Sequence, residues 1–322
     1  MKRSLRVFAL ALLALSPLFA QAQTKLKWAH VYEAGEPYHK WSVWAAGEIE
    51  KRSSGRYHID VYPASQLGKE SDINQGLTLG TVDIILGGSS FQARDYAPLA
   101  VTYFPFIFRD PAQVFAYAKS PIYRNLADGY EKASGNHIVA LTYYGARHVT
   151  SNKPVAKPED MKGLKIRVPD APAYIAFPKA LGANPTPIAF AEVYLALQNG
   201  TVDAQENPLP TIRAKKFYEV QKYISLTGHI YDSLNTIVSG SLWKRLSDAD
   251  KQMFSDVMQQ AAESAGKEIA EQEKTLVDWF KQQGVQVLTV DRDAFRAVVL
   301  KNAKPEDFSY RRADYETIQA LK

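Results

Sequence analysis

A repeated tetrapeptide constrains the fold of this chain more than any other feature. Gly-Thr-Val-Asp occurs at residues 80–83 and again at residues 200–203. Each copy follows a segment that predicts a helix, and each leads into an apolar run that predicts a strand. Glycine suits the position just after a helix, where the backbone adopts a positive φ. Two units of this kind in one chain predict two lobes of similar construction.

The residues around the first copy predict alternating strands and helices. Strands are expected at residues 25–30, 57–62 and 82–86, and helices at residues 38–53 and 70–79. A β-α-β-α-β order implies an α/β fold with a mainly parallel sheet.

Ligands of open α/β sheets bind beyond the carboxyl ends of the strands. The strand after each tetrapeptide ends at residues 87–90 (Gly-Gly-Ser-Ser) and at residues 206–208 (Glu-Asn-Pro). We therefore expect these two segments to form opposite walls of a cleft between the lobes.

A long uninterrupted helix is expected near the end of the chain. Residues 247–283 contain no proline, Ser247-x-x-Asp250 resembles a capping box, and apolar residues recur at helical spacing. A helix of about 35 residues would be roughly 50 Å long, which exceeds one lobe, so we expect it to lie across both. We assign residues 23–145 to lobe I, with a return segment at about 236–270. Lobe II takes residues 146–235, with a C-terminal segment at about 271–322.

The first 22 residues have the pattern of a secretory signal peptide. A basic start is followed by an apolar stretch and by Ala20-Gln21-Ala22, which predicts cleavage after about Ala22. The mature protein is expected to be exported, to the periplasm if the source is Gram-negative. Losing Lys2, Arg3 and Arg6 reduces the formal net charge from +5 to about +2. With no basic cluster elsewhere, we expect no nucleic-acid partner.

Catalytic signatures are missing from the sequence. The chain has no cysteine, which excludes thiol catalysis and thiolate metal sites, and its six histidines are scattered. No nucleophile elbow, P-loop, zinc-protease or dinucleotide motif is present. We expect no enzyme activity, no metal and no cofactor. A secreted enzyme remains an alternative, with His30 and Glu33 as its loosely plausible pair.

Two arginines stand at the ends of predicted strands and suit the binding of a small anion. Arg147 follows a strongly β-prone run, and Arg167 lies in Gly-Leu-Lys-Ile-Arg-Val-Pro at residues 163–169, where Lys165 faces water. A guanidinium binds a carboxylate through two parallel hydrogen bonds and stays charged when desolvated. The pattern alone leaves open whether each arginine binds a ligand or forms a structural ion pair.

Four motifs in order resemble the solute-binding proteins of tripartite ATP-independent periplasmic (TRAP) transporters, of the DctP-like type. They are Ser-Gln-Leu-Gly at residues 65–68, Gly-x-Arg-x-x-Thr-Ser-Asn-Lys-Pro at 145–154, Met-Lys-Gly-Leu-Lys-Ile-Arg-Val-Pro at 161–169 and Val-Asp-Ala-Gln-Glu-Asn-Pro at 202–208. The resemblance spans about residues 24–310. It implies an α/β, two-lobed fold of the periplasmic-binding-protein type (type II), with a long C-terminal helix bridging both lobes. It also implies that the protein binds a small organic acid and delivers it to a membrane permease driven by an ion gradient.

The resemblance also implies roles for individual residues. Arg167 corresponds to the family's carboxylate anchor, Arg147 to a second contact with the same anion, Asn207 to a cleft amide and Phe190 to an aromatic that packs on the ligand. Lobe I supplies seven further candidates: His30, Tyr32, Glu33, Glu70, Ser89, Ser90 and Gln92. The segment near the return to lobe I supplies three more: Tyr231, Asp232 and Asn235.

The composition of the candidate site predicts the class of ligand. Its many hydroxyl, amide and imidazole groups favour a hydroxylated monocarboxylate such as a sugar acid or aldonate, because a buried polar group left unpaired costs about 1–3 kcal/mol. A C4-dicarboxylate would need a second cation for its second carboxylate, and Arg94 is the only basic residue expected near the cleft wall of lobe I. This argues against a C4-dicarboxylate. A C4-dicarboxylate or keto-acid binding protein, a binding protein of an ABC importer and a ligand-presenting sensor subunit remain alternatives. Without a sustained heptad pattern, we expect a monomer.

Overall fold

The structure is a computed structural model, and it describes residues 23–304 and 310–322. The expected signal peptide and its cleavage site lie outside the described residues. Within the described ranges, none of the helices combines the length and the apolar character needed to cross a membrane.

In the described ranges nine strands form one sheet, in the order β2-β1-β3-β8-β4-β7-β5-β6, with β9 paired to β8. The strands are β1 Thr24–Ala29, β2 Tyr57–Tyr62, β3 Ile84–Gly88, β4 His137–Ser151, β5 Lys165–Val168, β6 Asn184–Pro187, β7 Ala204–Pro208, β8 Tyr223–Val238 and β9 Gln286–Leu288. The α-helices are α1 Pro37–Arg52, α2 Glu70–Leu79, α3 Ser89–Gln92, α4 Pro111–Ala118, α5 Pro121–Ser134, α6 Ala176–Ala180, α7 Val193–Gln198, α8 Leu209–Ala214, α9 Gly240–Arg245, α10 Asp248–Gln282, α11 Arg292–Asn302 and α12 Arg312–Gln319.

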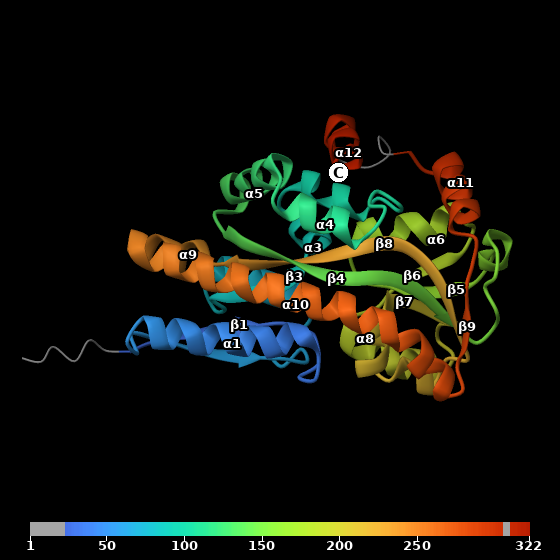
Figure 1. Cartoon of the computed structure of the whole chain (residues 1–322), viewed down its shortest axis with the longest axis horizontal. Helices are drawn as coiled ribbons and strands as arrows, with labels where there is room; N and C mark the ends of the chain where they lie inside the picture. Colours follow the sequence, from blue (N-terminus) through green and yellow to red (C-terminus); the bar gives the residue numbers. More distant parts are fainter. Residues whose placement is uncertain (1–22, 305–309) are drawn as a thin grey trace, which may run out of the picture.

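The sheet has two ends of similar construction, joined by two long strands. At one end β2, β1 and β3 run parallel, and at the other end β6, β5 and β7 run parallel. The strands β4 and β8 pair antiparallel along their length, and the register shifts next to Gly145. The expected lobe boundaries, at residues 145/146 and 235/236, fall inside these two strands, so both β4 and β8 belong to both ends of the sheet (Figure 1).

The repeated tetrapeptides form the same turn in the two ends of the sheet. Gly80 and Gly200 have φ angles of 76° and 74°. The carboxylate of Asp83 accepts a hydrogen bond from the backbone N–H of Lys27, and Asp203 accepts one from Lys165. The third strand begins at residue 84 rather than 82, because these turn contacts occupy the residues before it.

The long helix α10 lies across the molecule, as predicted. The hydroxyl of Ser247 accepts a hydrogen bond from the backbone N–H of Asp250 and caps its first turn. The helix contacts α1, β4 and α8, and Figure 1 shows it running from the α9 side to the α8 side. Its buried apolar face includes residues that recur at helical spacing in the sequence: Phe254, Val257, Ala261, Ala265, Ile269, Leu276 and Phe280.

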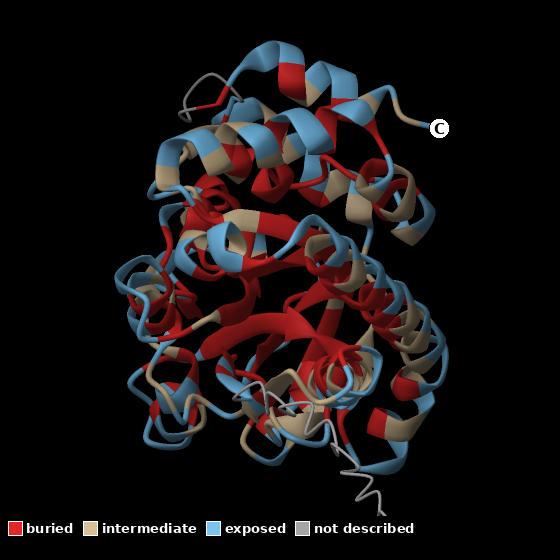
Figure 2. Ribbon diagram, turned by 90° about the vertical axis from the view of Figure 1, so that its left-hand side faces the viewer, coloured by how far each residue is buried: buried red, intermediate tan, exposed pale blue. Residues whose placement is uncertain are grey.

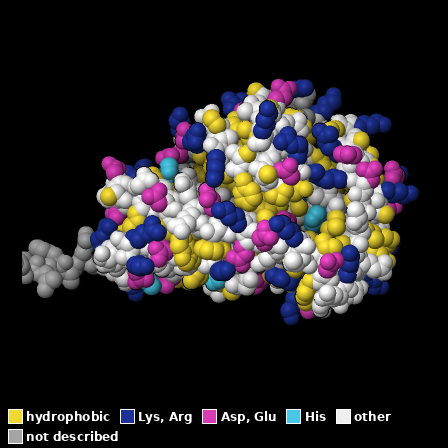
Figure 3. All heavy atoms as spheres, in the orientation of Figure 1, with side chains coloured by type: hydrophobic (Ala, Val, Ile, Leu, Met, Phe, Trp, Pro, Cys, Tyr) yellow, Lys and Arg dark blue, Asp and Glu magenta, His cyan; other side chains and the backbone are white. Residues whose placement is uncertain are grey.

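The buried residues lie along the sheet and on the inner faces of the helices that cover it (Figure 2). On the face seen in Figure 3, basic and acidic side chains are interspersed around a central apolar area. The polar residues inside the molecule are concentrated where β4, β7 and β8 meet.

Candidate binding site

A small cavity lies between the two ends of the sheet. Residues before α1, at the start of α2, at the end of β3 and on α3 line one side. Residues of β4, β5, β7 and the segments after β5 and β6 line the other. The lining consists of Tyr32, Glu70, Gly88, Phe91, Tyr144, Arg147, Arg167, Pro169, Tyr174, Phe190 and Asn207. The cavity therefore lies beyond the carboxyl ends of parallel strands, where the fold favours ligand binding.

Arg167 offers an unpaired guanidinium edge to this cavity. Its side chain is buried, and its Nε atom donates a hydrogen bond to the carbonyl oxygen of Ile188 at 2.9 Å. Its two terminal nitrogens have no hydrogen-bond partner among the described residues. Burial lowers the pKa of Arg167 to about 10, so it remains charged at neutral pH. A carboxylate is the group that such an edge binds best.

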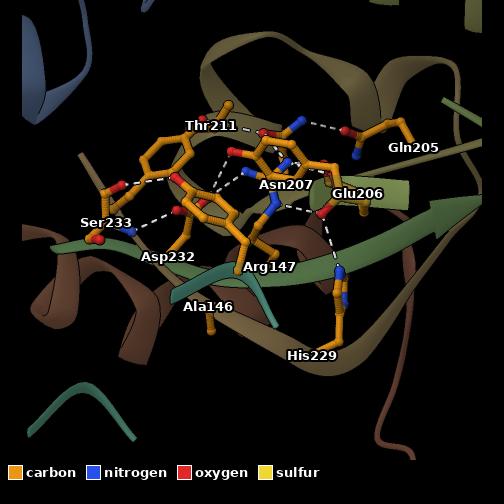
Figure 4. Close-up of polar contacts among 12 residues, drawn as sticks. Ala146, Arg147, Gln205, Glu206, Asn207, Thr211, His229, Asp232 and Ser233 are labelled. Atoms are coloured by element: carbon orange, nitrogen blue, oxygen red, sulfur yellow. Dashed lines mark hydrogen bonds and ion pairs between the residues drawn. The ribbon is translucent and has the colours of Figure 1, made fainter. Parts of the chain in front are cut away.

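Arg147 is equally buried, and carboxylates of the protein already neutralise it (Figure 4). Its Nε and one terminal nitrogen bind the carboxylate of Glu206, and its other terminal nitrogen binds Asp232 at 2.9 Å. Burial alone would lower the pKa of Arg147, but Glu206 and Asp232 outweigh it and raise that pKa well above its usual value. Burial would raise the pKa of Glu206, yet Arg147 holds it at about 2.

The Arg147 network continues away from the cavity through His229. The Nε2 atom of His229 lies 3.1 Å from Glu206, and its Nδ1 atom lies 2.8 Å from the hydroxyl of Thr227. Burial lowers the pKa of His229, which favours the neutral ring. A neutral ring satisfies both contacts when Nε2 donates to Glu206 and Nδ1 accepts from Thr227.

Asn207 and two tyrosines connect this network to the cavity. The amide oxygen of Asn207 accepts hydrogen bonds from Arg147 and from the hydroxyl of Tyr144, and its nitrogen donates to Gln205. The hydroxyl of Tyr174 donates to Asp232. Neither tyrosine was among the site residues expected from the sequence: Tyr144 stands in a β-prone run next to the Gly-x-Arg motif, whereas nothing in the sequence distinguishes Tyr174.

The other side of the cavity carries a buried carboxylate. Glu70 is the first residue of α2, and it forms no ion pair within the described ranges. Burial raises the pKa of Glu70, and the charge of Arg167 partly opposes that rise. The ring of Tyr32 packs beside it against Tyr144 and Phe190, with centroids 5.2 Å and 6.2 Å away.

The structure places the remaining candidates outside the cavity lining. Asp232 lies one hydrogen bond away, behind Tyr174. His30 pairs with His39, Glu33 with Lys215, Ser89 with Asn235, and Gln92 with Asn74. The ring of Tyr231 packs on Arg292, and Ser90 is buried without a hydrogen-bond partner for its hydroxyl among the described residues.

Comparisons with known proteins identify the family. A sequence model of the bacterial extracellular solute-binding proteins, family 7, matches residues 28–305. The sialic acid-binding periplasmic protein SiaP of Vibrio cholerae is 34% identical, over 91% of this chain and 92% of its own. The 2,3-diketo-L-gulonate-binding periplasmic protein YiaO of Escherichia coli is 35% identical, over 77% of this chain and 76% of its own.

Solved structures give the same result. A TRAP periplasmic solute-binding protein from Polaromonas sp. JS666, bound to D-erythronate, matches with a TM-score of 0.89 and 32% identity, over 93% of this chain and 99% of that one. One from Roseobacter denitrificans, with bound L-galactonate, matches with a TM-score of 0.85 and 30% identity, over 91% and 98% of the two chains. The predicted family and two-lobed α/β fold are thus confirmed. The chain belongs to family 7 of the bacterial extracellular solute-binding proteins, and it is the solute-binding protein of a TRAP transporter rather than an enzyme.

Proposed function

We propose that this protein captures a hydroxylated monocarboxylate, a sugar acid or aldonate, in the periplasm and delivers it to a membrane permease. The observation that carries the proposal is the pair of buried terminal nitrogens on Arg167 that have no acceptor within the described residues. A buried donor without an acceptor costs about 1–3 kcal/mol, and a ligand carboxylate removes that penalty. D-erythronate and L-galactonate, bound by the two structural relatives, combine one carboxylate with several hydroxyls.

The charges around the cavity support one carboxylate rather than two. Arg147 is already paired with Glu206 and Asp232, so Arg167 is the cation available to the ligand. Beyond it the ligand meets Glu70, whose carboxylate repels a second anion and accepts hydrogen bonds from hydroxyls. A C4-dicarboxylate would therefore bury its second charge beside Glu70.

The arrangement suggests a sequence of events for capture. Arg167, Asn207 and Phe190 receive the acid on lobe II, and closure of the cleft brings Tyr32 and Glu70 of lobe I onto its hydroxylated end. The ligand shifts the protein toward the closed form because it binds that form better. In this proposal lobe I comprises residues 23–145 and about 236–270, and lobe II comprises residues 146–235 and about 271–322. The signal peptide is removed after about Ala22, and the mature protein acts as a monomer.

Thermal shift and calorimetry test the ligand class. D-erythronate, L-galactonate, L-fuconate and galacturonate are screened beside succinate, a C4-dicarboxylate. An acid at 100 times its Kd should raise the stability of the wild-type protein by about 2.7 kcal/mol. We expect at least one sugar acid to do so and succinate to have little effect. Stabilisation by succinate alone would contradict the proposed ligand class.

Arg167→Met tests the anchor with the same acids. Met fills a similar volume without the charge, and we expect the affinity to fall by roughly 30-fold or more, since removing one partner of a desolvated charge pair costs about 2–5 kcal/mol. Lys165→Met, on the exposed side of the same strand, is the matched control and should bind normally. Equal affinity of Arg167→Met and the wild-type protein would show that the carboxylate binds elsewhere.

A further inference from the structure

The loop between β1 and α1 reaches from lobe I to α8 of lobe II, next to the wall of the ligand cavity. The hydroxyl of Thr211 donates a hydrogen bond of 2.7 Å to Glu36, and the amine of Lys215 forms an ion pair of 2.7 Å with Glu33. None of these four residues lines the cavity. Both contacts join segments on opposite sides of the cleft.

We propose that Glu33, Glu36, Thr211 and Lys215 form an interlobe clasp, which holds the closed form together and sets how long the ligand stays bound without touching the ligand. The proposal rests on the proposed function, because a clasp matters only if the lobes close around a ligand. Opening of the cleft separates the loop from α8 and breaks both contacts.

The surroundings of Glu36 favour this role over simple packing. Its side chain is buried, yet it forms no ion pair within the described ranges. Its acceptors are satisfied by the hydroxyl of Thr211 and by the backbone N–H of Glu33. A buried carboxylate without a cation is unfavourable unless hydrogen bonds compensate it. One of these two hydrogen bonds comes from the opposite lobe. Closure of the cleft therefore supplies a donor to the carboxylate of Glu36, and in the open form water must replace that donor.

The clasp abuts the cavity wall on two sides. The amine of Lys215 lies 5.1 Å from the ring centroid of Phe190, whose ring also lies 5.9 Å from the guanidinium of Arg167. The hydroxyl of Thr211 lies 3.4 Å from that of Tyr144, another lining residue. A ligand that orders Phe190 and Tyr144 therefore also orders the two residues of lobe II that the loop must meet.

Protonation provides a readout that mere packing would not affect. Burial raises the pKa of Glu36 to about 7, against the hydrogen bond from Thr211. The charged and titratable groups around it are Glu33 on its own loop, Arg213 on α8, Lys215 just after α8, Tyr38 on α1 and Tyr144 on β4. Lys215 pairs with Glu33 and Arg213 with Gln272 of α10. Opening exposes Glu36 and returns its pKa toward the usual value, so the closed form binds the proton more tightly and a fall in pH from 7 favours closure.

Stopped-flow dissociation of a bound acid tests the clasp directly. The probe is whichever of D-erythronate, L-fuconate and L-galactonate stabilises the wild-type protein most. We expect Thr211→Val to raise the dissociation rate roughly tenfold, as for the loss of a hydrogen bond to a charged group, with a much smaller change in the association rate. Thr201→Val, the same substitution on the exposed turn of lobe II, is the control and should change neither rate. An unchanged dissociation rate for Thr211→Val would overturn the proposal.

The pH dependence gives a second variant with a different expected outcome. Glu36→Gln imitates the protonated carboxyl group, since its amide can donate to Thr211 and accept from the backbone of Glu33. We expect this variant to dissociate slowly at pH 7.5 and to lose the slowing that the wild-type protein shows as the pH falls toward 5.5. Equal pH profiles for the two proteins would show that Glu36 does not couple protonation to closure.

A measurement without ligand separates failure of the clasp from failure of the proposed function. The chain has no cysteine, so Leu79→Cys and Leu195→Cys, at exposed positions on the two lobes, can carry spin labels. Double electron–electron resonance should show a larger open population in Thr211→Val than in the background protein at pH 5.5. If none of the acids binds, the proposed function fails, and this distance comparison still decides the clasp. If an acid binds and the dissociation rate of Thr211→Val equals that of the wild-type protein, the clasp alone fails.

Discussion

The surroundings of Arg147 and of Arg167 differ more than their burial does. Each side chain is about 1% exposed. Arg147 has two carboxylate partners inside the protein, whereas Arg167 has one backbone carbonyl and two nitrogens without an acceptor in the described chain. One positive charge is compensated by the fold, and the other is left for a ligand. Stability and binding should therefore respond in opposite ways when each arginine is removed.

The largest effect is expected from Arg147→Met. It leaves the carboxylates of Glu206 and Asp232 buried without a cation, and breaking a buried pair in this way costs about 3–5 kcal/mol. Urea unfolding should show this loss in free energy of unfolding without ligand. Adding Glu206→Gln and Asp232→Asn to the variant removes the orphaned charges and should restore most of the loss. A loss below about 1 kcal/mol for Arg147→Met would mean that water reaches these carboxylates, and the contrast with Arg167 would disappear.

Arg167→Met should have a smaller effect on stability, of the opposite sign. It replaces two unsatisfied donors by an apolar side chain, and an unsatisfied buried group costs about 1–3 kcal/mol. We expect the ligand-free variant to be more stable in urea by up to that amount, although it no longer binds acid. A clear loss of stability would show that Glu70, across the cavity, depends on Arg167 as an ion partner.

Local patterns predicted much of the fold. The bounds of β2 and α2 follow from the sequence to the residue, and α10 agrees within one residue at each end. Each of these elements is determined by the periodicity and the capping residues of a short segment. The repeated turns at Gly80 and Gly200 likewise depend on neighbouring residues, which is why the similarity of the two ends of the sheet was visible in the sequence.

The partners of Arg147 could not be predicted in the same way. They meet it because β4 pairs with β7 on one side, where His148 faces Asn207, and with β8 on the other, where Ala146 faces Tyr231. Both pairings join residues far apart in the chain, so no local pattern records them. The resemblance to the family pointed to both arginines as ligand contacts and could not show that one of them is already compensated.

Polar residues at strand ends were hard to assign for a related reason. Alternation along a strand tells which residues share a face, but not whether that face meets the cavity or the inside of a lobe. Ser89 and Asn235 bind each other next to the β3–β8 pairing, and Gln92 binds Asn74 of α2. These contacts pair the polar groups with one another at the β3 end of the sheet, whereas Glu70 and Tyr32 reach the cavity.

The smallest expected effect is a difference in acid sensitivity. Arg147 holds the pKa of Glu206 at about 2 in the folded protein, against the rise that burial would cause and below the usual 4.5. A depressed pKa adds stability that is fully present above pH 4.5 and is lost as the pH falls toward 2. Between pH 4.5 and 3.5, this one group should contribute about 1 kcal/mol to the loss.

Urea unfolding of Glu206→Gln at pH 5.0, 4.5, 4.0 and 3.5 measures that contribution. Its free energy of unfolding should fall less steeply than that of the wild-type protein, by about 1 kcal/mol per pH unit at the acid end. Lys165→Met, which removes an exposed positive charge from β5, is the control, and its profile should run parallel to that of the wild-type protein. If the profile of Glu206→Gln also runs parallel to that of the wild-type protein, the groups around Arg147 do not change their protonation on unfolding. The two arginines then differ in their partners but not in the pH range over which they affect stability.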